Sequence, residues 1–160
     1  GRRACEPIAE HPRRTLAKRY RRATKEAAKI TRESSAEALH ELRIHCKRLR
    51  YGLELHGTAL GDTKQAVRHL KSLQSVLGDF NDLSVQRQRL LECLGRGQSG
   101  IDPQVCAALG GLIVALASEQ DRVRAEYWGA YKAFSEPRVR RLFTQLSASP
   151  ARHLRRGRAA

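Results

Sequence analysis

Apolar residues recur along the chain with the spacing of amphipathic helices. From residue 103 to 134 they return every three or four positions, and a similar stripe runs through residues 62–94. Alternating strand patterns and Asn-Gly or Asp-Gly hairpin turns are absent from the sequence. The stripe in the later segment consists of Val105, Leu109, Leu112, Leu116, Val123, Tyr127, Ala130 and Phe134. The pattern predicts an all-α protein.

Helix-capping residues divide the chain into five helices. Ser34 and Glu37 offer a capping box, Asp62 can cap the next helix, and Asp102 followed by Pro103 is a strong helix start. The predicted helices cover residues 8–32, 36–56, 62–94, 103–134 and 137–147. Long amphipathic helices with short connections pack in antiparallel fashion. We therefore expect an antiparallel four-helix bundle with a short extra C-terminal helix over residues 1–147, and a basic, disordered tail over 148–160.

The net charge is strongly positive and unevenly distributed. The chain has 31 Lys and Arg against 16 Asp and Glu, a formal charge of +15. Residues 14–75 hold 15 basic against 6 acidic residues, whereas residues 76–134 hold 6 against 7. A clustered excess of this kind indicates a polyanionic partner rather than a generally soluble surface.

Other features narrow the class of protein. No apolar run approaches the roughly 20 residues that a membrane-spanning helix needs, which excludes an integral membrane protein. The four cysteines are far apart and form no C-x-x-C pair, as expected of a reduced, cytoplasmic protein. Because the chain begins at Gly1 and contains no Met, we expect it to be part of a longer protein.

The basic residues fall on helical stripes. In the first predicted helix one face carries Arg14, Lys18, Arg21, Arg22, Lys25, Lys29 and Arg32. In the second, His40, Arg43, Lys47 and Arg50 share a face that Tyr51 adjoins, and Lys64, Arg68 and Lys71 align on the third. These three lines predict one extended groove for a flexible polyanion, since Arg and Lys form charge-assisted hydrogen bonds with phosphate oxygens.

Catalytic and metal-binding patterns are missing from the sequence. The histidines and cysteines show no ligand spacing on a common face, and no phosphate-binding glycine loop is present. Phosphoanhydride hydrolysis commonly uses Mg²⁺ held by acidic residues, and the basic segment has few of them. We therefore expect a non-enzymatic protein with no metal and no cofactor.

Two motifs in tandem resemble the conserved-histidine α-helical domain, or CHAD, family. The motifs are LHELRIHCKRLRYGLEL and LKSLQSVLGDFNDL, and the resemblance extends over about residues 8–134. His40, Arg43, Lys47, Arg50 and Tyr51 match the first family signature, and Gln74, Leu77, Gly78, Asn81 and Asp82 match the second. The resemblance implies an all-helical fold that binds inorganic polyphosphate through a basic surface, near polyphosphate granules in the cytoplasm.

The resemblance also implies a second bundle. Family members have two four-helix bundles related by pseudo-twofold symmetry, each with its own histidine motif, and some are fused to a triphosphatase-type tunnel domain. This chain has one copy of the motif and resembles the C-terminal half. Two possibilities follow: the other half belongs to the longer protein, or two chains pair as a homodimer.

Several readings stay open at this point. The favoured hypothesis for the function is non-catalytic polyphosphate binding. The alternatives are a nucleic-acid-binding domain, an accessory module of a triphosphatase and a purely structural bundle. His40 can serve as a phosphate donor or as a hydrogen-bonding contact to a neighbouring helix, with Asp79 or Asp82 as its acceptor. Asn81 lies near the apolar face of its helix, which favours a structural contact.

Overall fold

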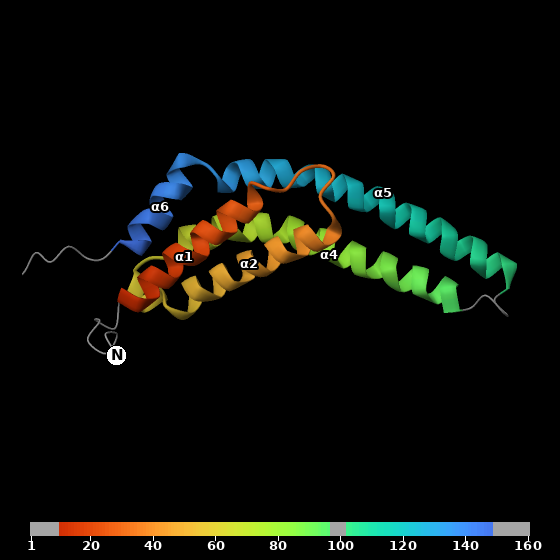
Figure 1. Ribbon diagram of the computed structural model, residues 1–160, viewed down its shortest axis with the longest axis horizontal. Coiled ribbons are helices and arrows are strands. Elements are labelled where there is room, and N and C mark those ends of the chain that lie inside the picture. Colours follow the sequence, from red (N-terminus) through yellow and green to blue (C-terminus); the bar gives the residue numbers. More distant parts are fainter. Residues whose placement is uncertain (1–9, 97–101, 149–160) are drawn as a thin grey trace, which may run out of the picture.

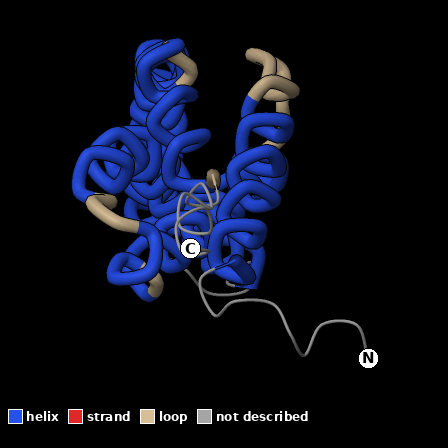
Figure 2. The backbone as a smooth tube through the Cα atoms, turned by 90° about the vertical axis from the view of Figure 1, so that its left-hand side faces the viewer, coloured by secondary structure: helices blue, strands red, loops and turns tan. Residues whose placement is uncertain are grey.

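The regular elements of the protein are all helices. The computed structural model describes residues 10–96 and 102–148, and within these residues there is no strand (Figures 1 and 2). The helices are α1 (Glu10–Ala27), α2 (Ala36–Leu55), α3 (Gly57–Leu60), α4 (Lys64–Arg96), α5 (Pro103–Phe134) and α6 (Pro137–Ser147). The predicted all-α class is confirmed, while the predicted tail lies outside the described residues except for Ala148.

Helix α2 occupies the centre of the packing. It contacts α1 on one side and α4 on the other, α5 runs back along α4, and α6 returns against α1 (Figure 1). The leucines of α2 and α4 meet in the core, where Leu42, Leu49, Leu70 and Leu77 are at most 1% exposed. Tyr20, Phe134 and Phe143 close one end of this core by stacked and edge-on ring contacts between α1, α5 and α6.

Side-chain caps define the starts of three helices; Asp62 and Asp102 are the predicted caps, while α2 is capped by Ser35, the residue after the predicted Ser34. The Ser35 hydroxyl accepts a hydrogen bond from the Ala38 amide at 3.3 Å, and the Asp102 carboxylate accepts one from the Gln104 amide at 2.7 Å. Asp62 likewise accepts from the Lys64 amide at 3.0 Å. Each bond satisfies a first-turn amide that has no partner within its own helix.

The first helix ends five residues earlier than the sequence predicts, at Ala27 instead of residue 32. In the loop that follows, the Thr31 amide donates to the Ser34 hydroxyl at 2.9 Å, and the Glu33 amide donates to the Thr31 hydroxyl at 3.3 Å. Such local bonds compete with helical ones. The early end also lets Ile30 turn into the core, where it is 7% exposed.

Three arginines link separate elements through hydrogen bonds to backbone carbonyls. Arg13 donates to the carbonyls of Leu146 and Ala59 at 2.9 and 2.8 Å, so it joins α1 to α6 and α3. Arg19 donates to the Arg48 carbonyl at 3.0 Å and links α1 to α2. Arg124 of α5 donates to the carbonyls of Arg32 and Ser34 at 3.0 and 2.6 Å, which fixes the α1–α2 loop. Part of the positive charge is therefore used to build the fold.

The apolar stripe predicted for residues 103–134 is only half covered. Its second half is buried, with Val123 at 4% and Tyr127 at 1% exposed, but Val105 and Leu112 in its first half are 48% and 54% exposed. The reason is length: α4 and α5 extend together beyond the helices that cover them elsewhere (Figure 1). The four-helix arrangement therefore exists only in the part of the molecule where α1 and α2 are present.

The buried hydroxyl of Tyr127 provides a test of the packing of α5 against the end of α1. It donates to the Ala27 carbonyl at 2.8 Å. Tyr127→Phe removes this bond without changing the ring, so we expect the free energy of unfolding to fall by about 1 kcal/mol in urea denaturation. Tyr131→Phe is the matched control, because the half-buried Tyr131 ring stacks on Tyr127 and its hydroxyl has no hydrogen-bond partner among the described residues. Equal stability of the two variants would contradict the assignment.

Candidate functional site

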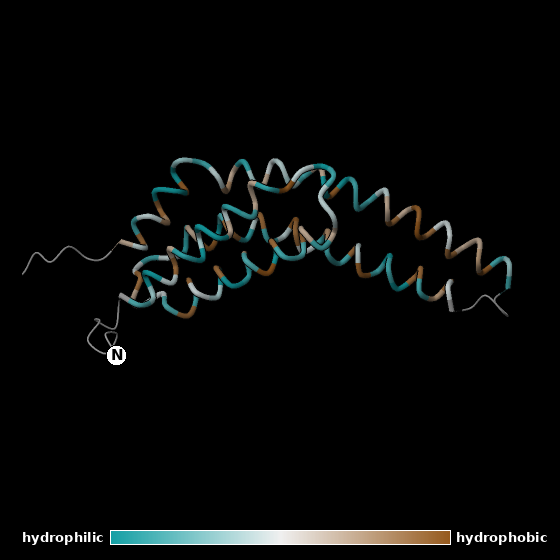
Figure 3. The backbone as a smooth tube through the Cα atoms, in the orientation of Figure 1, coloured by the Kyte–Doolittle hydropathy of each residue, from teal (hydrophilic) through white to brown (hydrophobic). Residues whose placement is uncertain are grey.

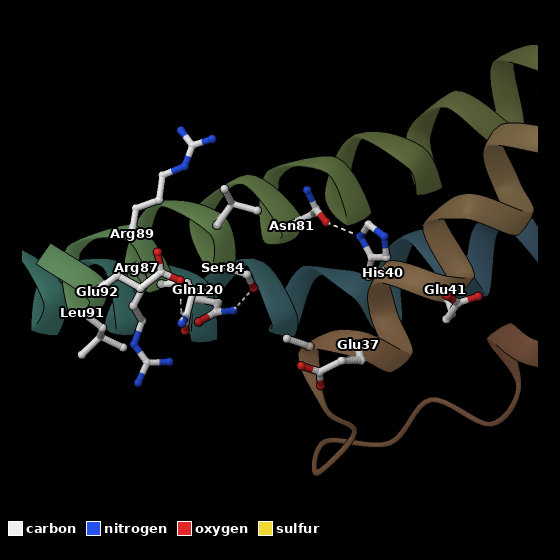
Figure 4. Close-up of a pocket in the computed structure, with 13 residues that line it drawn as sticks. Glu37, His40, Glu41, Asn81, Ser84, Arg87, Arg89, Leu91, Glu92 and Gln120 are labelled. Atoms are coloured by element: carbon white, nitrogen blue, oxygen red, sulfur yellow. Dashed lines mark hydrogen bonds between the residues drawn. The ribbon is translucent and has the colours of Figure 1, made fainter. Parts of the chain in front are cut away.

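The signature histidine bridges α2 and α4. His40 Nδ1 lies 2.6 Å from the Asn81 Oδ1 atom (Figure 4). Because the Asn81 amide nitrogen donates to Asp82 Oδ1 at 3.3 Å, Oδ1 of Asn81 is the acceptor and His40 Nδ1 is the donor. The partner of His40 is thus Asn81 rather than either of the two aspartates that the sequence suggested.

This contact sets the register between the two antiparallel helices. Each residue advances 1.5 Å along a helix, so positions at equal spacing from His40 and Asn81, in opposite directions, lie at one level. Arg43 then lies at the level of Gly78, Lys47 at that of Gln74, and Arg50 at that of Lys71. We call these four levels the α2–α4 seam. The two family signatures are therefore the two sides of one seam.

The cations of α2 are held partly within this seam. Arg43, Lys47 and Arg50 are all half-buried. The Tyr51 ring, 49% exposed, lies 6.0 Å from Lys47 Nζ and 5.4 Å from the Arg50 guanidinium carbon. These are cation–π distances, and they orient both cations beside the ring.

Few carboxylates compensate these charges. Arg50 Nε approaches Glu54 at 3.7 Å, which is an ion pair but too long for a hydrogen bond. Among the described residues, no ion pair engages Arg43, Lys47, Lys64, Arg68 or Lys71. Lys71 of α4 is exposed at the last level of the seam, and Lys64 and Arg68 are exposed on α4 beyond it, so cations of both helices face solvent here.

Two residues of α4 leave the seam open. A Cβ atom added at Gly78 would meet no atom within 4 Å, so the absence of a side chain leaves free space at the level of Arg43. One turn away, the Gln74 Oε1 atom is buried and has no hydrogen-bond partner. Gly78 costs about 1 kcal/mol of helix stability relative to Ala. Because no neighbouring atom would clash with a side chain at this position, helix packing does not account for the glycine.

The predicted basic line of the first helix forms a second surface. Arg14, Lys18, Arg21, Arg22 and Lys25 are exposed on α1, and we call them the α1 row. Lys29 and Arg32, which the sequence placed on the same helix, lie in the loop after it because α1 ends at Ala27.

Glu26 relieves part of the repulsion along this row. It accepts a hydrogen bond from Lys29 at 2.9 Å and lies 3.3 Å from Arg22. The Lys29 hydrogen bond, with the positive charges of Lys29 and Arg22 adding to it, holds the pKa of Glu26 below its ordinary value. Within the described part of the chain, Lys18, Arg21 and Lys25 have no such partner.

The α1 row and the α2–α4 seam lie on different sides of α2. Gly52 of α2 faces α1 so closely that an added Cβ would lie 2.7 Å from Arg19 Nη1. Around the helix, Gly52 is roughly 120° from His40, which faces α4. The structure thus brings together the basic lines of the second and third predicted helices, but not that of the first.

Arg140 of α6 extends the α1 row, although it is not among the binding residues that the sequence predicts. Arg140 and Arg21 line one cavity of about 460 Å³, together with Tyr20 and Phe143. Burial raises the pKa of the Tyr20 hydroxyl, and the nearby Arg140 charge opposes this effect. Only the return of α6 against α1 brings Arg140 here, so no local pattern could have indicated it.

Other chemistry is sparse in the described residues. No group of three or more His, Cys, Asp or Glu side chains there is placed to hold a metal ion. None of the described helices is both long enough and apolar enough to cross a membrane. Burial raises the pKa of the Cys46 thiol to about 12, as expected of a packing residue rather than a nucleophile.

These features define a class of protein: a helical bundle whose second and fourth helices are pinned by a histidine and line a basic seam. The family model of the CHAD domain matches residues 2–91, a stretch that includes α1, α2, α3 and most of α4. The match spans more than half of the 160 residues, and the chain belongs to the CHAD domain family. No curated protein matches the chain.

A double-mutant cycle tests whether His40 and Asn81 act as a pair. We expect His40→Ala and Asn81→Ala each to lower the free energy of unfolding by about 1 kcal/mol, and the double variant to lose less than their sum. The coupling should be roughly 0.5–1.5 kcal/mol, because either single change removes the same hydrogen bond. Strictly additive losses in urea denaturation would show that the contact does not set the register.

Proposed function

We propose that this CHAD-family chain binds inorganic polyphosphate through the α2–α4 seam and performs no catalysis on it. The observation that carries the proposal is a row of cations from two helices, Arg43, Lys47, Arg50 and Lys71, in which the described residues form a single ion pair, between Arg50 and Glu54. A flexible chain of phosphate groups would supply the missing negative charge at every level. Arg can engage two phosphate oxygens at once, and the half-buried positions strengthen such bonds.

The α1 row provides a further contact surface for a long polyanion. Its exposed cations and Arg140 belong to α1 and α6 rather than to the seam helices, and a long flexible chain is able to reach both surfaces. The seam has the better-ordered groups, because its α2 cations are half-buried and two of them lie against the Tyr51 ring. We therefore assign the primary site to the seam and a supporting role to the α1 row.

Polyphosphate is favoured over nucleic acid by the scarcity of aromatic groups. Proteins that bind single strands stack successive bases on aromatic side chains. Beside the seam only one described aromatic side chain, Tyr51, is exposed, and Lys47 and Arg50 already lie at cation–π distances from its ring. The other ring-bearing residues of the core, such as Tyr127, Phe134 and Phe143, are at most 1% exposed.

Removal of two seam cations should weaken polyphosphate binding. We expect Arg43→Ala with Lys47→Ala to raise the Kd at least about tenfold at roughly 0.15 M salt, measured by titration with labelled polyphosphate. The slope of log Kd against log salt should fall by about 1.4, since roughly 0.7 is lost for each contact with a single-stranded polyanion.

The matched control removes the same charge elsewhere. Arg122 is paired with Glu119 and Glu126, and Arg138 with Glu136, so Arg122→Ala with Arg138→Ala also lowers the net charge by two. This control should bind nearly as the wild type does. A wild type that fails to bind, or equal losses in the two double variants, would contradict a site in the seam.

Gly78 separates stability from binding. Gly78→Ala should stabilise the fold by up to about 1 kcal/mol in thermal or urea unfolding, because the new methyl group meets no neighbour. Gly78→Glu places a carboxylate at the level of Arg43 and should weaken polyphosphate binding severalfold. Gly129→Glu, at another open helical position, makes the same change in charge away from the seam. If both Glu variants bind alike, the space beside Gly78 has no part in the site.

A further inference from the structure

The groove between α1 and α6 contains a cavity that no residue of the α2–α4 seam lines. The two helices run in opposite directions, because Arg13 near the start of α1 donates to the Leu146 carbonyl near the end of α6 (Figure 1). Further along α1, the Tyr20 ring stacks on the Phe143 ring. Hydrophilic and hydrophobic stretches alternate along both helices in Figure 3, as expected of helices that bury one side only.

The cavity takes one stripe of side chains from each helix. Tyr20 and Arg21 come from α1, whereas Arg140, Phe143 and Ser147 come from α6. The α6 residues are spaced by three and four positions, which places them on a single face of that helix. The volume of about 460 Å³ is within the range of sites for small molecules, and a single inorganic ion would fill only part of it.

Two arginines line this cavity from opposite helices at nearly the same level. Arg21 directly follows Tyr20, and Arg140 precedes Phe143 by three positions, which is a shift in the same direction along antiparallel helices. At a rise of about 1.5 Å per residue, the two levels differ by roughly 3 Å. Neither guanidinium has an ion pair or hydrogen bond with another described residue, and no described lining residue is acidic. Two positive charges thus share one cavity without compensation.

Hydroxyl groups add neutral donors beside these charges. The hydroxyls of Tyr20 and Ser147 have no hydrogen-bond partner among the described residues. Burial raises the pKa of the Tyr20 hydroxyl, and the Arg140 charge only partly opposes this effect, so the group remains protonated and able to donate at neutral pH. A phosphate attached through one oxygen carries a charge of about −2 and accepts hydrogen bonds through three oxygens. Such a group matches two guanidiniums and two hydroxyls.

The remaining surface of the cavity is apolar. Ala17, Phe143 and Ala148 line it beside the ring of Tyr20. An inorganic phosphate ion would leave these groups in contact with water, whereas an apolar group attached to the phosphate would cover them. The lining therefore favours a ligand with both a phosphate and an organic part.

We propose that the cavity between α1 and α6 binds a small organic phosphate monoester, with its phosphate between Arg21 and Arg140 and its organic group against Tyr20 and Ala17. This ligand differs from the flexible chain of phosphates assigned to the seam. The proposal goes beyond polyphosphate binding and does not rest on it, because the two sites share no residue.

The test is a titration with phenyl phosphate at roughly 0.15 M salt, followed by the amide chemical shifts of the isotope-labelled chain. We expect saturable shifts concentrated on α1 and α6 near Tyr20 and Thr144. Arg21→Ala and Arg140→Ala should each raise the Kd about tenfold or more, because each removes charge-assisted hydrogen bonds to the phosphate. Inorganic phosphate should bind severalfold more weakly, since it leaves the apolar lining uncovered.

Arg22→Ala and Arg138→Ala are the matched controls. Each removes one positive charge from the same helix as a cavity arginine, but both residues are paired with a glutamate and do not line the cavity. These variants should bind phenyl phosphate nearly as the wild type does. The Arg43→Ala, Lys47→Ala variant should also bind it normally while its affinity for polyphosphate falls, so the two sites are tested independently.

Three results would overturn the inference. The first is a wild type that binds polyphosphate but gives no saturable shifts with phenyl phosphate, which would leave the seam proposal intact. The second is an equal Kd for phenyl phosphate in Arg21→Ala and Arg22→Ala. The third is tighter binding of pyrophosphate than of phenyl phosphate, because the cavity would then hold the end of a phosphate chain instead of an organic ester.

Discussion

The register of α2 on α4 is the constraint on which the rest of the structure depends. Leu42, Leu49, Leu70 and Leu77 hold the two helices together, but leucine packing by itself tolerates a shift of one helix along the other. The His40–Asn81 hydrogen bond selects one alignment among these. In that alignment the spacing of three, four and three residues on α2 coincides with the same spacing on α4. Cations from both helices are then exposed along one line.

The basic residues of the protein divide into two groups by what they contact. Arg13 and Arg124 donate to backbone carbonyls at helix ends and in the α1–α2 loop, which lack helical partners, and Arg19 donates to the Arg48 carbonyl within α2. Arg43 and Lys47 have no carboxylate partner within the described structure. Electrostatic repulsion among such groups lowers stability, and the proposed polyanion would offset this cost.

Much of the fold follows from local signals, and the parts that do not are set by tertiary packing. The cap at Asp102 marks a helix start in the sequence, and the structure has it; at α2 the cap is Ser35, one residue after the predicted Ser34. The predicted end of the first helix, at residue 32, was wrong by five residues, since α1 ends at Ala27. The hydrogen bond between Thr31 and Ser34 and the burial of Ile30 outweigh helical propensity there. The short α3 was also missed, since its four residues carry no helical periodicity.

The candidate site shows the same division. Helical spacing correctly places the basic residues of α2 on one side of that helix, but it does not reveal which neighbour lies on which side. The contact of His40 with Asn81 shows which side of α2 faces α4, and that of Gly52 with Arg19 shows which side faces α1. Likewise, the apolar stripe of α5 looks continuous in the sequence. Tyr127 is buried because α1 and α2 extend to its level, whereas Leu112 is exposed because they end before it.

The most direct test of the account is a competition between polyphosphate and DNA for the seam. At roughly 0.15 M salt, polyphosphate should displace single-stranded DNA of equal charge from the wild-type chain, whereas the DNA should not displace polyphosphate. The preference should disappear in the Arg43→Ala, Lys47→Ala variant, because the ordered cations that distinguish the ligands are then missing. If DNA competes equally with polyphosphate on the wild type, the seam is a general polyanion surface and the central claim is wrong.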